Sequence, residues 1–268
     1  MIQIIQGRRT IRMETYKIYP ICTGIFTHAE KSNFAYQKDA GVKLKAPILC
    51  YLVQGNGHNI LVDTGGSDSE WAEKYHHPVY QTEDMKPENA IGKFGLKPED
   101  IDIIINTHLH WDHSFNNHLF PNAKIYAQKK EVEFAMAPVP TQYTYYESPQ
   151  IGMKPQWTQC LDRFEIIDGD YSLMDGIEII FAPGHTPGFQ AVCVNTTDGP
   201  FLIASDSTGI IEAWEDNQTQ GLPTPSGIHV NLIEYYQTIR KLYPTFDKYH
   251  ILPGHDPKAL EHDCYPYK

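Results

Sequence analysis

The sequence has no long apolar run and has little positive charge. No stretch approaches the roughly 18 consecutive apolar residues that a membrane-spanning helix needs. Lysine and arginine total 22 against 33 aspartates and glutamates, giving a formal net charge of −11. A surface of this sign does not attract nucleic acid or anionic lipid, so we expect neither as a partner. An acidic substrate is not excluded, because a bound metal ion can reverse the local field.

The cysteines lack the pattern of a disulfide framework or a zinc ribbon. There are five of them, an odd number, and no two have C-x-x-C spacing. This composition predicts reduced thiols packed as small apolar groups, and therefore a cytoplasmic protein. Residues 1–12 carry three arginines without a following apolar stretch, so we do not interpret them as a secretory signal. They are either a mis-assigned start or a loose N-terminal arm.

The chain also lacks repeats and low-complexity linkers, and its 268 residues are interpreted as a single domain, 1–268. Apolar alternation and turn signals predict strands and helices in a repeated order, which suggests two sheets packed face to face with helices outside. The expected strands cover 16–22, 48–53, 59–62, 101–106, 124–127, 163–167, 177–181, 191–195, 201–204 and 249–252, with the four from 163 to 204 in a second sheet. The expected helices cover 67–75, 87–94, 129–136 and 231–242. The expected long loops cover 24–41, 137–160 and 207–229.

The most informative stretch is Thr107–His113, which follows the apolar run Ile103–Ile105. It holds four side chains of the types that zinc or iron favours: His108, His110, Asp112 and His113. Residues two apart in an extended segment point the same way, so the first three can converge on one point. His113 breaks the alternation and is free to reach a second point. One loop can therefore supply ligands to two adjacent metal positions.

Three later positions have the same character. His185 lies in Pro-Gly-His-Thr-Pro-Gly after the expected strand 177–181, Asp206 follows the strand 201–204, and His255 follows the strand 249–252. Each places a metal-capable group just past the end of a strand. If the sheets run as proposed, these loops share one rim with the first cluster.

In these motifs the chain resembles the metallo-β-lactamase superfamily, from about Tyr16 to His255. The resemblance implies an α/β fold, the four-layer αβ/βα sandwich, with a two-metal site between the sheet edges. It implies that metal one is held by His108, His110 and His185, metal two by Asp112, His113 and His255, and that Asp206 bridges them beside a shared water or hydroxide. Asp63 matches the family's Val-Asp-Thr-Gly turn and would orient a histidine ligand through its ring N–H; the alternative is a plain turn residue.

This ligand set predicts a metal-dependent hydrolase. Two divalent ions about 3.5–4 Å apart would lower the pKa of a bound water, and the resulting hydroxide would attack a carbonyl whose oxyanion the ions stabilise. Asp112 is the predicted catalytic proton shuttle to the leaving group. We expect two divalent metal ions per chain, zinc first, with iron or manganese as alternatives.

The substrate is narrowed by comparing branches of the family. Asp206 argues against true β-lactamases, His110 against flavodiiron oxidoreductases, and the charge of −11 against ribonuclease Z-like members. The spacing of the ligands looks most like the N-acyl-homoserine lactonases, with the 4-pyridoxolactonase type beside them. We expect opening of a lactone ring, with a quorum-quenching role. The alternatives are hydrolysis of another ester, a thioester (as in glyoxalase II) or a cyclic amide, and, less favoured, an iron-dependent persulfide dioxygenase or a binding module.

Aromatic residues and one missing tyrosine bear on how the substrate is held. Aromatic residues in the expected loops could hold an apolar tail or could pack their own loops; they are Phe26, Phe34, Tyr143, Tyr145, Tyr146 and Trp157. Lactonases of this branch carry a tyrosine three positions after the bridging aspartate, where this chain has Gly209. Either a neighbouring loop residue such as His229 or Tyr143 takes over this contact, or the substrate differs; His229 is expected to be a catalytic residue, the alternative being a buried structural histidine. The expected partner is a small-molecule substrate, and a homodimer is left open.

Overall fold

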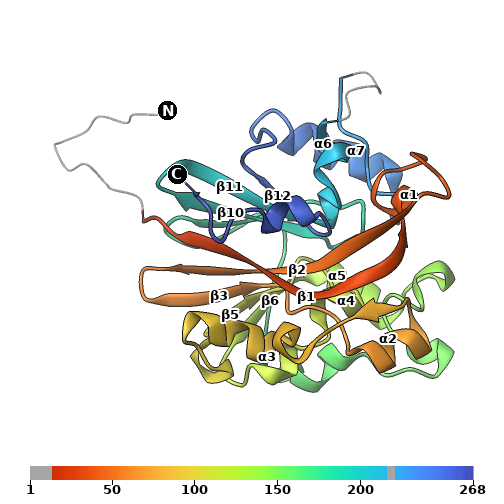
Figure 1. The fold of residues 1–268 in the computed structure, drawn as a ribbon, viewed down its shortest axis with the longest axis horizontal. Helices are drawn as coiled ribbons and strands as arrows, with labels where there is room; N and C mark the ends of the chain where they lie inside the picture. Colours follow the sequence, from red (N-terminus) through yellow and green to blue (C-terminus); the bar gives the residue numbers. More distant parts are fainter. Residues whose placement is uncertain (1–13, 216–220, 268) are drawn as a thin grey trace.

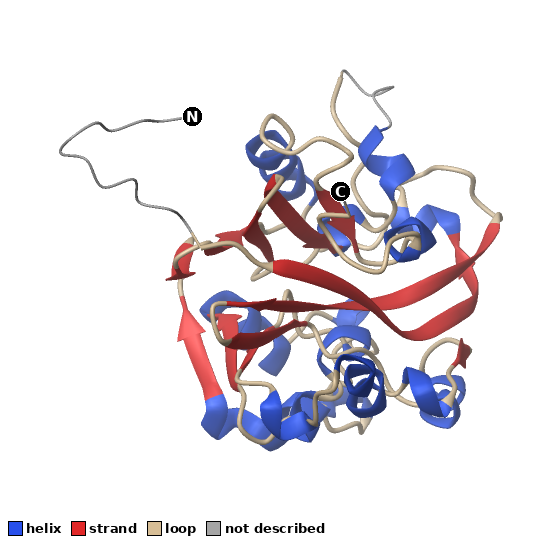
Figure 2. Cartoon of the chain, turned by 60° about the vertical axis from the view of Figure 1, so that its left-hand side comes forward, coloured by secondary structure: helices blue, strands red, loops and turns tan. Residues whose placement is uncertain are grey.

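The structure is a computed structural model that describes residues 14–215 and 221–267. The predicted N-terminal arm, residues 1–12, lies outside the described part. Two β-sheets face each other and helices cover their outer faces, which makes the four layers of an αβ/βα sandwich (Figures 1 and 2). The predicted fold class is confirmed.

The first sheet has seven strands in the order β4-β1-β2-β3-β5-β6-β7. Strands β1, β2 and β3 pair antiparallel, and β3, β5, β6 and β7 are parallel neighbours. The strands are β1 (Lys17–Glu30), β2 (Lys43–Gly55), β3 (His58–Val62), β4 (Val79–Tyr80), β5 (Ile103–Ile105), β6 (Lys124–Gln128) and β7 (Phe164–Ile167).

The second sheet has five strands in the order β12-β11-β10-β9-β8. They are antiparallel except for the parallel pair β11 and β12. The strands are β8 (Tyr171–Met174), β9 (Ile177–Phe181), β10 (Gln190–Thr196), β11 (Gly199–Ser205) and β12 (Ile251–Pro253).

The helices lie mainly in the connections between strands. The α-helices are α1 (Lys31–Phe34), α2 (Ser69–Tyr75), α3 (Pro87–Ala90), α4 (Trp111–Ser114), α5 (Lys129–Met136), α6 (Ile211–Glu215) and α7 (Leu232–Leu242). The 3₁₀ helices are Glu83–Met85, Ile91–Phe94, Pro98–Asp100, Asn117–Leu119, Pro140–Gln142, Pro149–Ile151, Gln156–Arg163, Asp206–Thr208 and Pro257–Leu260. None of the helices in the described ranges is long and apolar enough to cross a membrane.

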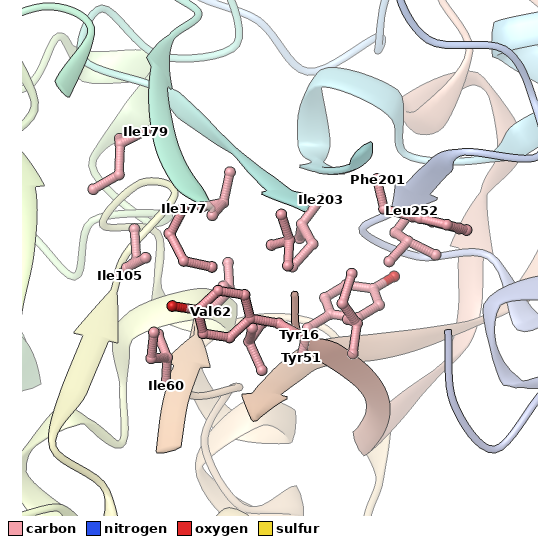
Figure 3. Close-up of a cluster of buried hydrophobic side chains, with 14 of the residues drawn as sticks. Tyr16, Tyr51, Ile60, Val62, Ile105, Ile177, Ile179, Phe201, Ile203 and Leu252 are labelled. Carbon is pink, nitrogen blue, oxygen red and sulfur yellow. The ribbon is translucent and has the colours of Figure 1, made fainter. Parts of the chain in front are cut away.

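The main core lies between the two sheets. In Figure 3, Ile60, Val62 and Ile105 of the first sheet face Ile177 and Ile179 of the second. Because successive residues of a strand point to opposite faces, Leu61 and Ile104 turn to the other side, where they pack under the helices. This burial on both faces explains why the central strands are continuous apolar runs.

Two expectations about strands are wrong. The first strand does not end at Cys22 but runs to Glu30, because β1 stays paired with β2 along its length and also pairs with β4. The expected loop 24–41 therefore begins as a strand. Phe164–Ile167 belongs to the first sheet, beside β6, and not to the second. Alternation of apolar and polar residues predicts a strand with one buried face, but it does not predict which strand it pairs with.

The fold places the candidate site at the ends of five strands. Strands β3, β5, β9, β11 and β12 are each followed within a few residues by an aspartate or histidine of the predicted set. All five cysteines are free thiols, as predicted.

Candidate metal centre

Three buried histidines from two loops form the first half of the site. His108 and His110 follow β5, and His185 follows β9. Nε2 of His185 lies 3.2 Å from Nε2 of His108 and 3.3 Å from Nδ1 of His110. One ring nitrogen from each histidine lies within 4.8 Å of the other two. Ring nitrogens facing one another at these distances form a pocket of lone pairs suited to a divalent cation.

The second half of the site consists of Asp112, His113 and His255, which also present ligand atoms within 4.8 Å of one another. Asp206 lies between the two halves. Its Oδ1 is 3.0 Å from Nε2 of His255 and 3.5 Å from Nε2 of His113, while its Oδ2 is 3.4 Å from Nε2 of His185. Each oxygen of Asp206 therefore faces a different half, which is the arrangement of a bridging carboxylate.

Asp63 lies behind His113, outside the centre. Its Oδ2 accepts from Nδ1 of His113 at 2.9 Å and from Oγ1 of Thr107 at 2.8 Å, and its Oδ1 accepts from the Thr107 amide at 2.8 Å. Asp63 has a φ of +62°, a left-handed conformation that aspartate tolerates better than most residues. It thus holds the His113 ring with Nε2 directed inward and fixes the start of the ligand loop.

The other histidine rings are oriented in the same way. The ring nitrogen remote from the centre has an acceptor in each case, so the inner nitrogen keeps its lone pair. The acceptors are the Ile228 carbonyl at 2.7 Å for His185, the Pro47 carbonyl at 2.9 Å for His255, Oε1 of Gln142 at 3.0 Å for His110, and Oγ1 of Thr107 at 3.1 Å for His108.

Glu131 is a functional residue that the sequence analysis missed. This buried carboxylate of α5 accepts from the Leu109 amide (2.9 Å) and the Tyr146 hydroxyl (2.6 Å) through Oε1. Through Oε2 it accepts from Oγ1 of Thr186 (2.6 Å) and the Gly188 amide (3.2 Å). Leu109 and Thr186 neighbour the ligands of the first half, so Glu131 ties their two loops together. A glutamate in a helical pattern gives no sequence signal for this role.

The charge of the centre matches divalent cations. Burial alone would lower the pKa of His113, but Asp112, Asp206 and Asp63 outweigh it and raise that pKa to about 10. Burial and the neighbouring imidazoles lower the pKa of His108. Nε2 of His113 is fully buried and receives no hydrogen bond within the described part of the chain. The carboxylates on one side of the centre thus favour a positive charge nearby, and the neutral histidines on the other side offer lone pairs. Two bound divalent ions would satisfy both requirements.

Residues of the site line a cavity. Metal-facing residues on its wall include His110, Asp112, His185, Asp206 and His255. The aromatic side chains on the wall are Phe26, Phe34, Trp111 and Tyr145, and its polar residues include His28, Glu30, Asn33, Lys43 and His77.

The fold and the donor set are those of a known protein family. The family model described as the metallo-beta-lactamase superfamily matches residues 45–255. The chain belongs to this superfamily.

Relatives within the superfamily are named as lactonases. An N-acyl homoserine lactonase from Bacillus cereus is 32% identical over 190 residues, which cover 66% of this chain and 70% of that protein. The N-acyl homoserine lactonase AttM from Rhizobium radiobacter is 25% identical over 263 residues, covering 92% and 95%. A solved N-acyl homoserine lactone hydrolase, with the product N-hexanoyl-L-homoserine at its catalytic metal centre, has a TM-score of 0.73 at 25% identity, covering 93% and 96%.

Of the six aromatic residues expected to contact the substrate, Phe26, Phe34 and Tyr145 line the cavity, and Tyr143, Tyr146 and Trp157 do not. Phe26 and Tyr145 lie on the wall, and the Tyr145 ring stacks on His110 at 5.1 Å. Trp157 is a correction: it is 2% exposed and packs in the core with Leu109 and Tyr146. Tyr143 is half-buried but is not part of the wall.

His229, the other predicted catalytic residue, does not line the cavity. Its ring packs against Tyr36 at 5.1 Å and donates from Nδ1 to the Ser226 carbonyl at 2.8 Å, away from the cavity wall. These contacts give it a structural place in the loop before α7.

Proposed function

We propose that this superfamily member is a dinuclear metal hydrolase that opens the ring of a lactone, with N-acyl-homoserine lactones as the substrate class. The observation that carries the proposal is the pairing of two ligand groups through Asp206 on the wall of a cavity. Lactonase relatives covering most of the chain support the choice of a cyclic ester. The chain is a metal-dependent hydrolase; the number of ions and the substrate are the proposed part.

Each ion would have its own set of donors. His108, His110 and His185 would hold one ion, Asp112, His113 and His255 the other, and Asp206 both. Imidazole and carboxylate donors without a thiolate suit zinc. When bound, the ions would polarise the ester carbonyl and make a water nucleophilic near neutral pH.

The residues of the chain would bind the lactone and move its proton. Asp112 belongs to the second half of the centre and also lines the cavity wall, where its side chain is 11% exposed, whereas Asp206 is held between the two halves. Asp112 would take a proton from the attacking water and pass it to the alkoxide that leaves when the ring opens. Phe26 and Trp111 pack edge to face at 5.9 Å on the wall and would exclude bulk water from the reacting ester. Tyr145, stacked on His110, would donate a hydrogen bond to a polar group of the substrate.

The proposal is tested with zinc-loaded protein and a panel of N-acyl-homoserine lactones, with thioesters assayed in parallel. We expect ring opening in a preparation containing two metal ions per chain by elemental analysis. Asp112→Asn should lower kcat by about 10²–10⁴-fold, the usual contribution of a positioned acid–base group.

Two results would overturn the proposal. Absence of lactone hydrolysis at full metal loading, together with turnover of thioesters, would replace the lactonase with a thioesterase. One iron per chain and oxygen-dependent chemistry would favour the dioxygenase alternative.

Within the cell, five free thiols support a reducing compartment such as the cytoplasm.

A further inference from the structure

A short segment between the two longest strands closes one side of the cavity over the metal centre. It starts at α1, which follows the far end of β1 (Figure 1). Phe34, the last residue of α1, lines the cavity and is 7% exposed. Its ring centroid lies 5.1 Å from that of His255, one of the predicted ligands. Phe34 therefore stands directly beside the place where the reacting ester would bind.

The segment is fixed to the loop before α7. The Asn33 carbonyl accepts three hydrogen bonds: from Oγ of Ser226 at 2.7 Å and from the amides of Gly227 (2.9 Å) and Ile228 (3.2 Å). A Cβ on Gly227 would lie 1.9 Å from the Ser32 carbonyl oxygen, so only glycine permits this approach. These contacts make Phe34 part of a rigid wall.

Phe34 also fills the space above Gly209, three residues after the bridging Asp206. A Cβ on Gly209 would lie 3.0 Å from Cδ1 and 3.2 Å from Cβ of Phe34. Gly209 has a φ of −61°, which any residue can adopt, so the constraint comes from the phenylalanine and not from the backbone. On this side the cavity wall is therefore the Phe34 ring and not a side chain from the Asp206 loop.

Toward solvent the cavity wall carries charged and polar side chains beside apolar ones such as Ala29 and Pro78. Lys43 pairs there with Glu30, and His28 and Asn33 share the wall. An alkyl chain long enough to reach these groups would remove water from charged side chains without replacing its hydrogen bonds. A short or polar substituent would leave their hydration intact.

We propose that Phe34 determines specificity by limiting substrate size, so that the protein opens compact lactones with short or polar substituents in preference to lactones with long acyl chains. This inference rests on the proposed lactonase function and narrows its substrate class.

The test compares N-dodecanoyl- with N-butanoyl-homoserine lactone as the ratio of their kcat/KM values. Wild type should favour the butanoyl substrate, and Phe34→Leu and Phe34→Ala should each raise the dodecanoyl-to-butanoyl ratio at least tenfold, since single methylenes in apolar pockets discriminate by about 10–200-fold. Phe34→Leu keeps an apolar side chain in case Phe34→Ala does not fold. Calorimetry with the ring-opened dodecanoyl product should show tighter binding to Phe34→Leu than to wild type.

Two further variants sharpen the test. Tyr36→Leu changes an aromatic residue of the same segment that does not line the cavity, and it should leave the ratio unchanged. Gly209→Ala should press Phe34 toward the cavity and lower the ratio.

A wild type that prefers the dodecanoyl substrate would overturn the inference, as would an unchanged ratio in both Phe34 variants or a rise in Gly209→Ala. In each case lactone hydrolysis itself would still support the proposed function. If the metal-loaded wild type hydrolyses no lactone at all, the proposed function fails, and the inference fails with it.

Discussion

A single buried carboxylate spaces the two loops that supply the first three histidines. Glu131 accepts four hydrogen bonds: one from Leu109 in the loop after β5, two from Thr186 and Gly188 in the β9–β10 connection, and one from Tyr146. Burial raises the pKa of Glu131, and the four donors act against that rise. None of these four donors is a cation, so the negative charge of the buried Glu131 carboxylate is stabilised by the four hydrogen bonds themselves. The spacing of His108, His110 and His185 thus depends on a residue that binds no metal.

Glu131→Gln should weaken zinc binding. On either side the NH₂ group of the Gln would face a backbone N–H, that of Leu109 or that of Gly188, so at least this hydrogen bond to a ligand loop would be lost. We expect zinc affinity to fall by about 10–100-fold, the usual cost of losing a residue that orients ligands. A competition titration with a chromophoric chelator measures this.

Glu133→Gln is the matched control for this change. Glu133 is an exposed residue of the same helix, paired with Lys129. The control should bind zinc as wild type does. A folded Glu131→Gln protein with unchanged zinc affinity would show that the two loops hold their spacing without the carboxylate.

At the scale of elements, the connection from β9 to β10 is pressed between two helices. A Cβ on Gly184 would lie 2.4 Å from Cα of Tyr235 in α7, and a Cβ on Gly188 would lie 2.0 Å from the Glu131 amide nitrogen in α5. His185 lies between these two glycines. Both helices can approach the backbone beside His185 this closely only because these two glycines have no side chain.

Gly188→Ala should therefore destabilise the protein and disturb the metal centre. The added methyl group would meet backbone atoms that cannot rotate away, and overpacking of this kind costs about 1–3 kcal/mol. Urea unfolding of the zinc-loaded protein measures the change in the free energy of unfolding.

Gly92→Ala provides the comparison for this loop. A Cβ there meets no atom within 4 Å, and the residue is helical, so the substitution should be neutral or slightly stabilising. Equal stability of the two variants would argue against the tight packing of the β9–β10 connection.

At the scale of the whole molecule, the metal centre joins the two sheets. Its first four donors follow β5 of the first sheet, and His185, Asp206 and His255 follow strands of the second. Ions bound there would link the layers at their common edge, in addition to the apolar core between them. Ion binding to the folded state alone adds stability in proportion to the logarithm of the free metal concentration.

Removal of metal should lower the melting temperature. With free zinc a thousandfold above its Kd, the stabilisation is about 4 kcal/mol, which corresponds to about 8–16 °C in a domain of this size. Differential scanning calorimetry with zinc and with EDTA measures the difference. In Asp206→Asn the difference should shrink, because the carboxylate that faces both halves is lost. Equal melting temperatures of zinc-loaded and metal-free wild type would contradict the idea that the centre joins the sheets.

The sequence by itself determined the fold family and the set of donors that meet at the centre. These follow from local rules: a buried strand ends, and the next few residues carry imidazoles and carboxylates at a spacing that lets them converge. The tertiary structure decided how far β1 runs, which sheet takes β7, and that Trp157 and His229 pack away from the cavity. It also decided the roles of Glu131 and Phe34. Each of these depends on a partner distant in the chain, and the type of a residue does not reveal which partner it will meet.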